Sequence, residues 1–97
     1  PTIGRTHGIH AEPMSMGLKF LNWHAELLRD KGRLEYARKD VSVGKISGAV
    51  GTYAMSSPQL EARVCELLGL EPAKVSNQIL QRDRHAAILN ALARACP

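Results

Sequence analysis

The apolar residues of the first half of the chain recur at the spacing of an α-helix, and this pattern constrains the fold most. They follow one another at intervals of four, three, four and seven residues: Met16, Phe20, Trp23, Leu27 and Leu34. These intervals place side chains on one helical face. The pattern predicts a long helix over about 13–39, with Pro13 in its first turn, where proline's missing N–H costs nothing.

Two further helices are predicted, over about 58–69 and 76–96. Ser57 and Pro58 form a start signal for the first of them, and Gly69 forms a stop signal. Its expected apolar face consists of four residues: Leu60, Val64, Leu67 and Leu68. Ser76 or Asn77 could cap the last helix. Between the first two helices, residues 41–55 form a glycine-rich connection in which backbone approaches backbone or ligand.

We therefore expect an all-α fold of antiparallel helices. The apolar stripes are wider than 97 residues can cover, so the segment should belong to a larger helical bundle or a tight oligomer. Aromatic residues make up only 4% of the chain, which favours helices over a β-sandwich. Because the chain begins with Pro1 rather than Met, we expect it to be a processed or excised piece of a longer protein.

Charge and cysteine content narrow the possible classes of function. The net charge of +4 comes from basic residues scattered among acidic ones, whereas a nucleic-acid binder usually carries a stripe of one sign. A small anionic ligand suits this pattern as well. No run approaches the length of a membrane span. Cys65 and Cys96 lie in apolar helical runs, so we expect buried, reduced thiols in a cytoplasmic protein.

Residues 6–13 gather a hydroxyl, two imidazoles and a carboxylate immediately before the long helix. An imidazole can pass a proton near neutral pH. The spacing of His7 and His10 would suit a metal on a helix, but Gly8 and Pro13 favour a loop, and no ligand set elsewhere completes a site. The residues alone leave two interpretations open, catalytic histidines and hydrogen-bonded structural ones.

Two other segments carry weaker signals. Residues 44–52 look like a phosphate loop but lack its pattern, because Lys39 and Ile46 occupy positions that require Gly and Ser or Thr. They form either a close-packed turn or a backbone cradle for a ligand. Residues 78–85 gather polar groups near an expected helix start, where free N–H groups attract anions. A solvated first turn would give the same pattern.

Taken together, three blocks resemble a known family. Residues 4–13 resemble the Thr-His motif of the fumarase/aspartase superfamily in the form found in the adenylosuccinate lyase family. Residues 43–54 are similar to that family's glycine-rich connection, and residues 76–78 with 81–86 are similar to its third block. The resemblance implies the central helical-bundle domain of an all-α homotetramer, in which each active site takes loops from three chains.

The resemblance also implies a reaction. It is β-elimination of fumarate from adenylosuccinate, giving AMP, and from the succinylated aminoimidazole carboxamide ribotide of purine biosynthesis, without metal or organic cofactor. His7 matches the general acid that protonates the departing nitrogen, in a cleft between packed helices. Thr6 and Gln78 match substrate-binding residues, and His10 and Lys45 would lie nearby.

The family's flexible loop with the pattern Ser-Ser-x-Met-Pro-x-Lys-x-Asn, which carries its catalytic serine, has no match in this chain. We therefore expect these residues alone to lack lyase activity. Two alternatives stay open: another member of the superfamily, similar to argininosuccinate lyase, and a helical interaction module without chemistry. The scattered charges disfavour a nucleic-acid binder.

Overall fold

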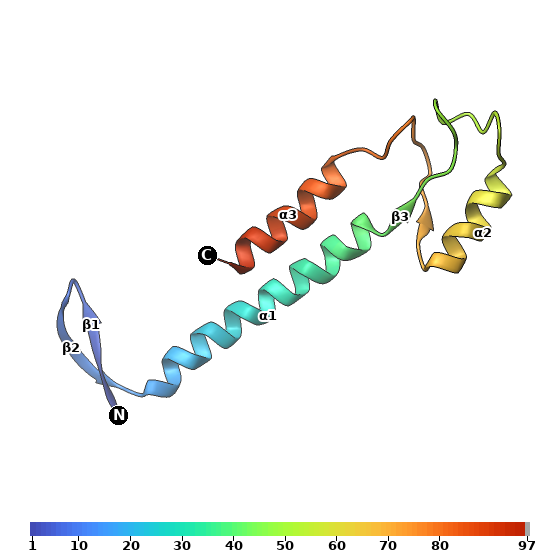
Figure 1. The fold of residues 1–97 in the computed structure, drawn as a ribbon. Helices are drawn as coiled ribbons and strands as arrows, with labels where there is room; N and C mark the ends of the chain where they lie inside the picture. The colour runs from blue at the N-terminus through green and yellow to red at the C-terminus, as the bar shows by residue number, and fades with distance from the viewer. Residues whose placement is uncertain (97) are drawn as a thin grey trace. The chain divides into compact units, whose positions relative to one another are not determined.

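The computed structural model describes residues 1–96 (Figure 1). Its elements, in chain order, are β1 (Thr2–Thr6), β2 (Ile9–Met14), α1 (Met16–Val41), β3 (Val43–Gly44), α2 (Pro58–Leu68), β4 (Glu71–Pro72) and α3 (Asp83–Ala95). The chain divides into two compact units, Pro1–Gly32 and the residues from Arg33 onward. Three helices agree with the sequence prediction, but the strands correct the expectation of an all-α segment.

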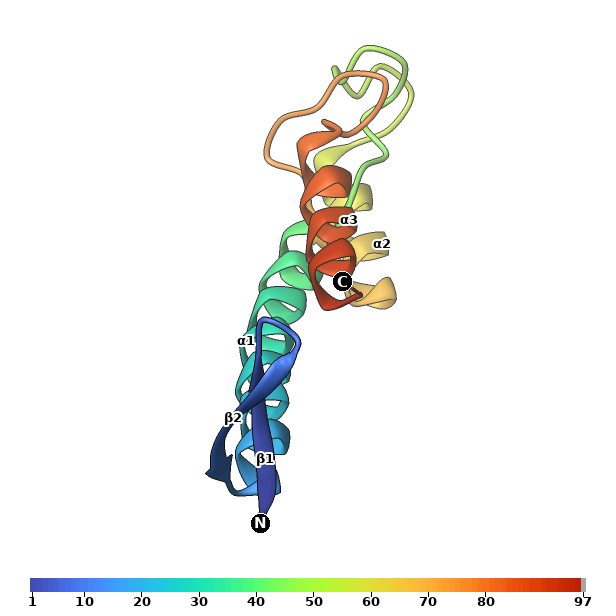
Figure 2. The same cartoon turned by 90° about the vertical axis from the view of Figure 1, so that its left-hand side faces the viewer.

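The first unit begins with a β-hairpin where the sequence predicted a loop. Strands β1 and β2 pair antiparallel, with Thr2 opposite Met14 and Thr6 opposite Ile9. Figure 2 shows the two strands twisted about each other, as neighbouring β-strands generally are. A register shift interrupts the ladder after Ile3. Gly4 fits there because an added Cβ would lie only 3.0 Å from the carbonyl oxygen of Glu12.

The hairpin turn consists of His7 and Gly8. Their φ angles are +51° and +75°, and two positive φ values in succession are what a two-residue type I′ turn requires. Glycine adopts this conformation without steric cost, whereas a histidine does so uncommonly. The turn therefore fixes the position of His7 at the tip of the hairpin.

Helix α1 begins at Met16 rather than near residue 13. Pro13 lies in β2, paired with Ile3. Proline is tolerated at this position because both strands of a two-stranded sheet are edge strands. Ser15 starts the helix instead, because its Oγ accepts a hydrogen bond from the amide of Gly17 at 3.2 Å.

The apolar stripe of α1 stays largely exposed in this chain. Phe20 and Trp23 contact each other edge to face, with ring centroids 5.6 Å apart, yet both side chains are more than half exposed. Leu18, Leu21, Leu27 and Leu28 are also exposed. The helical periodicity is therefore confirmed, but the first unit by itself leaves this stripe uncovered.

The second unit is built around a short parallel sheet. Strand β3 pairs with β4, so Val43 lies opposite Glu71 and Gly44 opposite Pro72. Gly44 packs so closely against α2 that a Cβ would lie 2.6 Å from Sγ of Cys65. This contact explains why glycine stands at the start of the connection.

Helix α2 begins and ends within a residue of its predicted bounds. The hydroxyl of Ser57 accepts the amide of Leu60, and Gly69, at a φ of +68°, donates back to the last turn. Its buried face, however, differs from the prediction. Glu61 and Cys65 are buried, whereas Leu60, Leu67 and Leu68 are exposed. The expected apolar face of α2 therefore does not form the core of this unit.

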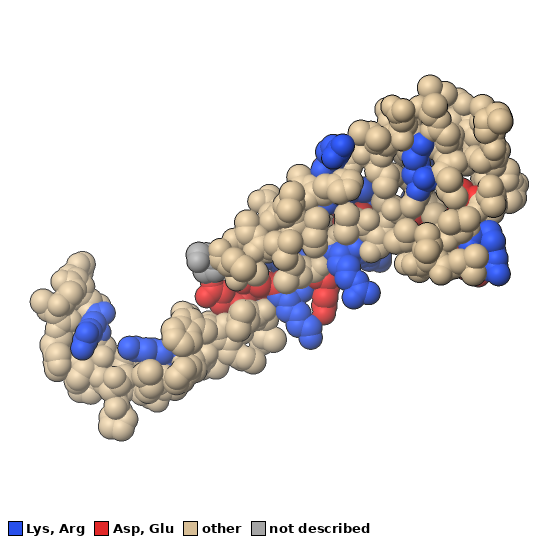
Figure 3. Space-filling model, viewed as in Figure 1, with Lys and Arg blue, Asp and Glu red and all other residues tan. Residues whose placement is uncertain are grey.

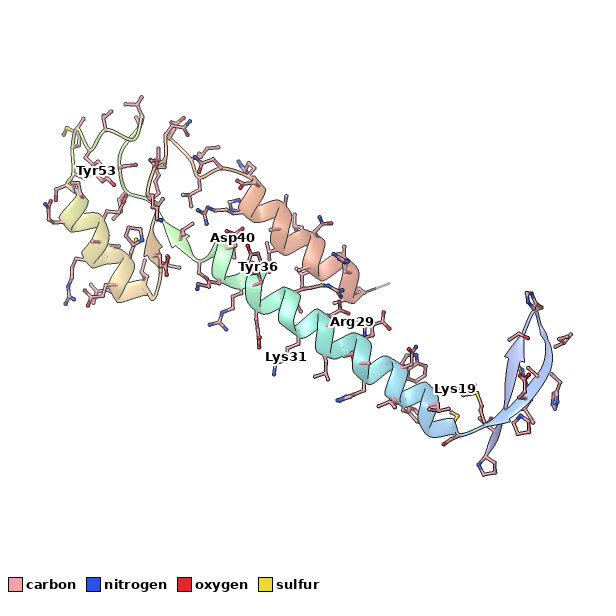
Figure 4. The ribbon with its side chains drawn as sticks, turned by 180° about the vertical axis from the view of Figure 1, so that it is seen from behind. Lys19, Arg29, Lys31, Tyr36, Asp40 and Tyr53 are labelled. Carbon is pink, nitrogen blue, oxygen red and sulfur yellow. The ribbon has the colours of Figure 1, made fainter. Side chains whose placement is uncertain are left out.

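Helix α3 begins at Asp83, later than the predicted start at residue 76. Ser76 does not cap a helix, because its hydroxyl pairs with that of Ser47 at 2.9 Å. Residues 73–82 instead form an irregular segment. Arg84 then ties the start of α3 to the end of α1, because its guanidinium donates to the carbonyl and the carboxylate of Asp40. Figure 4 labels Asp40 in the last turn of α1.

Charge and hydropathy follow the sequence analysis in most respects. On the face drawn in Figure 3, basic side chains stand among acidic and neutral ones rather than in one stripe. Within residues 1–96, no helix has both the length and the apolar character that crossing a bilayer requires.

Cys65 is buried and reduced as expected. Cys96 is also a free thiol, but it is exposed rather than buried, because it lies just past the end of α3.

Substitutions at two glycines of the connection can distinguish the cost of backbone strain from the cost of steric overlap. Gly48 and Gly51 have φ angles of +86° and +81°, but a Cβ on Gly48 meets nothing within 4 Å, whereas one on Gly51 would lie 1.9 Å from the carbonyl oxygen of Ser76. Gly48→Ala should lower the free energy of unfolding by about 1–2 kcal/mol. Gly51→Ala should lower it further, because backbone must move. Chemical denaturation of the full-length protein measures both, and equal losses would contradict the close approach of Gly51 to Ser76.

Candidate functional site

The hairpin brings three of the candidate residues together. Thr6 ends β1, His7 follows in the turn, and His10 lies in β2 opposite Arg5. The short turn holds the hydroxyl and both imidazoles at one end of a two-stranded ribbon. All three residues are exposed. The first unit thus presents a compact polar tip that a ligand or another protein surface can reach.

His7 does not lie in a cleft formed by its own unit. We expected its imidazole between packed helices, but the described residues of the first unit leave it exposed at the hairpin tip. Its positive φ is a local strain of the kind that often accompanies functional positions. An imidazole held this way can donate a proton only to a group that is brought to it from outside the hairpin.

In the second unit, Lys45 opens the glycine-rich connection directly after β3. Its Nζ donates a hydrogen bond to the carbonyl oxygen of Gly48 at 2.5 Å, so the side chain folds back over its own loop. It also lines a shallow cleft of about 390 Å³ together with Val43, Gly44, Ile79, Leu80, Arg82 and His85. Lys45 and Arg82 give this cleft two cationic side chains, which suits a small anion.

Gln78 lies in the irregular segment that precedes α3, not in the helix where the sequence placed it. Its side chain is exposed, and the next two residues line the cleft that Lys45 enters. The structure therefore brings Lys45 and the neighbours of Gln78 to one face of the second unit. Thr6, His7 and His10 belong to the other unit.

The sequence analysis missed a buried carboxylate in the second unit. Glu61 is 2% exposed. Its Oε2 accepts the amide of Ile46 at 2.5 Å, and its Oε1 accepts the hydroxyl of Tyr53 at 2.7 Å. Figure 4 labels Tyr53 in the connection that leads to α2. The available signal was a glutamate one turn before Cys65, on the same helical face. The leucines of α2 obscured it, because a leucine stripe normally marks the buried side.

The hydrogen bond to Glu61 changes the acidity of Tyr53. It raises the pKa of the phenol above its ordinary value of 10.0, with partial burial and the charge of the carboxylate adding to the effect. The physical reason is that a phenolate would lose its donated hydrogen bond and face a second negative charge. Tyr53 also has a positive φ of +58°, which is an uncommon backbone conformation for a residue other than glycine.

Comparison with known proteins identifies the family. A family model described as "Lyase" matches residues 1–96. The chain belongs to this lyase family. The family is the helical fumarase/aspartase superfamily, so the match confirms the resemblance on which the sequence analysis relied.

Individual members of the lyase family show how similar the chain is. It is 57% identical to an adenylosuccinate lyase of Thermotoga maritima and 60% identical to one of Deinococcus radiodurans, over 96% of its length. It is 55% identical over 94% of its length to an adenylosuccinate lyase of Bacillus subtilis. The chain spans about a fifth of the length of these relatives, 21–22%.

The raised pKa of Tyr53 predicts a pH dependence of stability. Because the pKa is higher in the folded than in the unfolded protein, the stabilisation is fully present below about pH 10 and is lost as pH rises through the folded value. Tyr53→Phe should therefore lower stability at neutral pH, and its deficit should shrink in alkali. Denaturation of the full-length protein from pH 7 to pH 11 measures the deficit. Tyr36→Phe, at an exposed phenol on α1, is the matched control. A deficit that stays constant with pH would contradict the assignment.

Proposed function

We propose that this chain forms part of an adenylosuccinate lyase. The protein would eliminate fumarate from adenylosuccinate, leaving AMP, and from the succinylated aminoimidazole carboxamide ribotide. The observation that carries this proposal is the identity of 55–60% to adenylosuccinate lyases over nearly the whole chain. Both substrates carry a succinyl group on nitrogen, so one site could serve both.

The reaction needs two proton transfers and the movement of two electron pairs. A base takes the proton from the β-carbon of the succinyl group, the electrons of that C–H bond form the double bond of fumarate, and the C–N bond breaks. The electrons of the C–N bond remain on nitrogen, which takes up a proton. We assign that proton to His7, since a positioned imidazolium contributes about 10²–10⁴-fold to such a step. The resemblance does not assign the base that takes the first proton to any residue of this chain.

The other candidate residues would bind the substrate. The amide of Gln78 can donate to a carboxylate and accept from an N–H, which suits orienting rather than proton transfer. Thr6, beside His7 at the hairpin tip, would orient the reacting end of the substrate. His10 offers a hydrogen bond from the same hairpin, and Lys45 offers a positive charge beside the basic cleft.

We further propose a homotetramer whose active sites are shared between subunits. The support is the apolar stripe of α1, whose exposed leucines and aromatics need a covering surface. The exposure of His7 points the same way, because a proton donor at a hairpin tip needs a cleft that other segments complete. The cytoplasmic setting expected from the sequence fits this proposal.

Replacing His7 tests the acid. In the full-length protein, His7→Gln should lower kcat by about 10²–10⁴-fold with little change in KM, because glutamine keeps the size and polarity of the side chain but cannot deliver the proton. His24→Gln, at an exposed histidine on α1, is the control and should leave turnover unchanged. Fumarate release followed by absorbance measures all three proteins. Near-normal turnover of the His7 variant would remove it from the acid role.

Mixing two inactive variants tests the shared site. If His7 and Gln78 of one subunit serve different active sites, hybrids of His7→Gln and Gln78→Ala subunits should contain some sites with both residues intact. Activity should then reappear when the two proteins are dissociated together and reassembled. Each variant reassembled alone is the control. Hybrids that remain as inactive as either parent would contradict sharing of these two residues.

A further inference from the structure

The buried carboxylate of Glu61 holds the glycine-rich connection at two points. Its two oxygens accept one bond from the backbone at Ile46 and one from the side chain of Tyr53. Glu61 lies on α2, one turn past the N-cap, and both bonds link this helix to the connection. Hydrogen bonds to a carboxylate are about twice as strong as those between neutral groups. The connection is therefore tied at two positions, Ile46 and Tyr53, to one buried carboxylate.

The connection passes this restraint to the segment that carries Gln78. The amide of Tyr53 donates to the carbonyl oxygen of Ser47 at 2.8 Å, and Ser47, which is 3% exposed, pairs through its hydroxyl with Ser76 at 2.9 Å. Gly51 lies so close to the carbonyl of Ser76 that no side chain would fit between them. Ser76, two residues before Gln78, is thus hydrogen-bonded to the connection through its side chain and packed against it through its backbone.

We propose that Glu61 is a positioning residue for Gln78. It touches no substrate. Through the connection and Ser76 it fixes the backbone from which the exposed amide of Gln78 projects. The role of Gln78 rests on the proposed function, whereas the path of contacts from Glu61 to Ser76 does not.

The chemistry of the two bonds suggests a pair of variants. Glu61→Leu keeps much of the volume but removes both acceptors, which leaves the amide of Ile46 unpaired. Glu61→Gln can keep both contacts, because its oxygen accepts the amide and its NH₂ donates to the hydroxyl oxygen of Tyr53 once that hydroxyl rotates. Glu66→Leu is the matched control, since Glu66 lies on the same helix and pairs with Arg63 on the surface.

The experiment is a double-mutant cycle in the full-length protein. Glu61→Leu should lower kcat/KM for adenylosuccinate by about 10²-fold, the size of loss that a misplacement of about 1 Å can cause. Glu61→Gln and Glu66→Leu should stay near wild type. In a Gln78→Ala background, Glu61→Leu should cause little further loss, because two residues that act through one contact are not additive. A purely structural glutamate would instead lower activity by the same factor in both backgrounds.

Each outcome decides the proposal. Wild-type activity in Glu61→Leu, or additive losses, would overturn it. If Glu61→Leu does not fold, Ser47→Ala takes its place, since it removes only the bond to Ser76, and the same cycle with Gln78→Ala applies. If the wild-type protein releases no fumarate, the proposed function fails, and amide hydrogen exchange at residues 76–78 becomes the readout. Faster exchange in Glu61→Leu but not in Glu66→Leu supports the positioning role, and equal exchange refutes it.

Discussion

One buried carboxylate determines the arrangement of the second unit. Glu61 lies on α2 and is 2% exposed, and its two oxygens accept hydrogen bonds from Ile46 and Tyr53 of the glycine-rich connection. Leaving such a buried donor or acceptor without its partner costs about 1–3 kcal/mol, so the connection and α2 stabilise each other. The close approach of Gly44 to Cys65 and of Gly51 to Ser76 is possible because this loop is held in place.

The first unit meets a different requirement, which is to present polar groups rather than bury them. Its type I′ turn holds His7 in an uncommon backbone conformation and places the imidazole at the tip of a ribbon, next to Thr6. A histidine in this position can serve a site only if another surface closes over it. That requirement and the exposed stripe of α1 are the two observations behind the proposed assembly, in which neighbouring helices would complete the cleft.

The sequence predicted the parts of the fold that depend on local chemistry. Ser57 with Pro58 and Gly69 placed α2 correctly, because capping acts within a few residues. It missed the hairpin, since Pro13 next to a helical pattern favoured a helix start, while His7 and Gly8 lack the asparagine or aspartate common in such turns. It placed α3 too early because the hydroxyl of Ser76 bonds to Ser47, a contact between residues far apart in sequence. The burial of Glu61 was missed because the leucines of α2 suggested a different buried face. The candidate site residues came from the resemblance, and their roles remain predictions.

The most direct test of the account is a crystal structure of the full-length protein with AMP and fumarate bound. We predict that the imidazole of His7 lies within hydrogen-bond distance of the nitrogen from which fumarate departs, inside a cleft closed by helices of neighbouring subunits, with the amide of Gln78 directed at the ligand. A His7 ring that faces open solvent in that complex, or that contacts a part of the ligand remote from the broken bond, would contradict it.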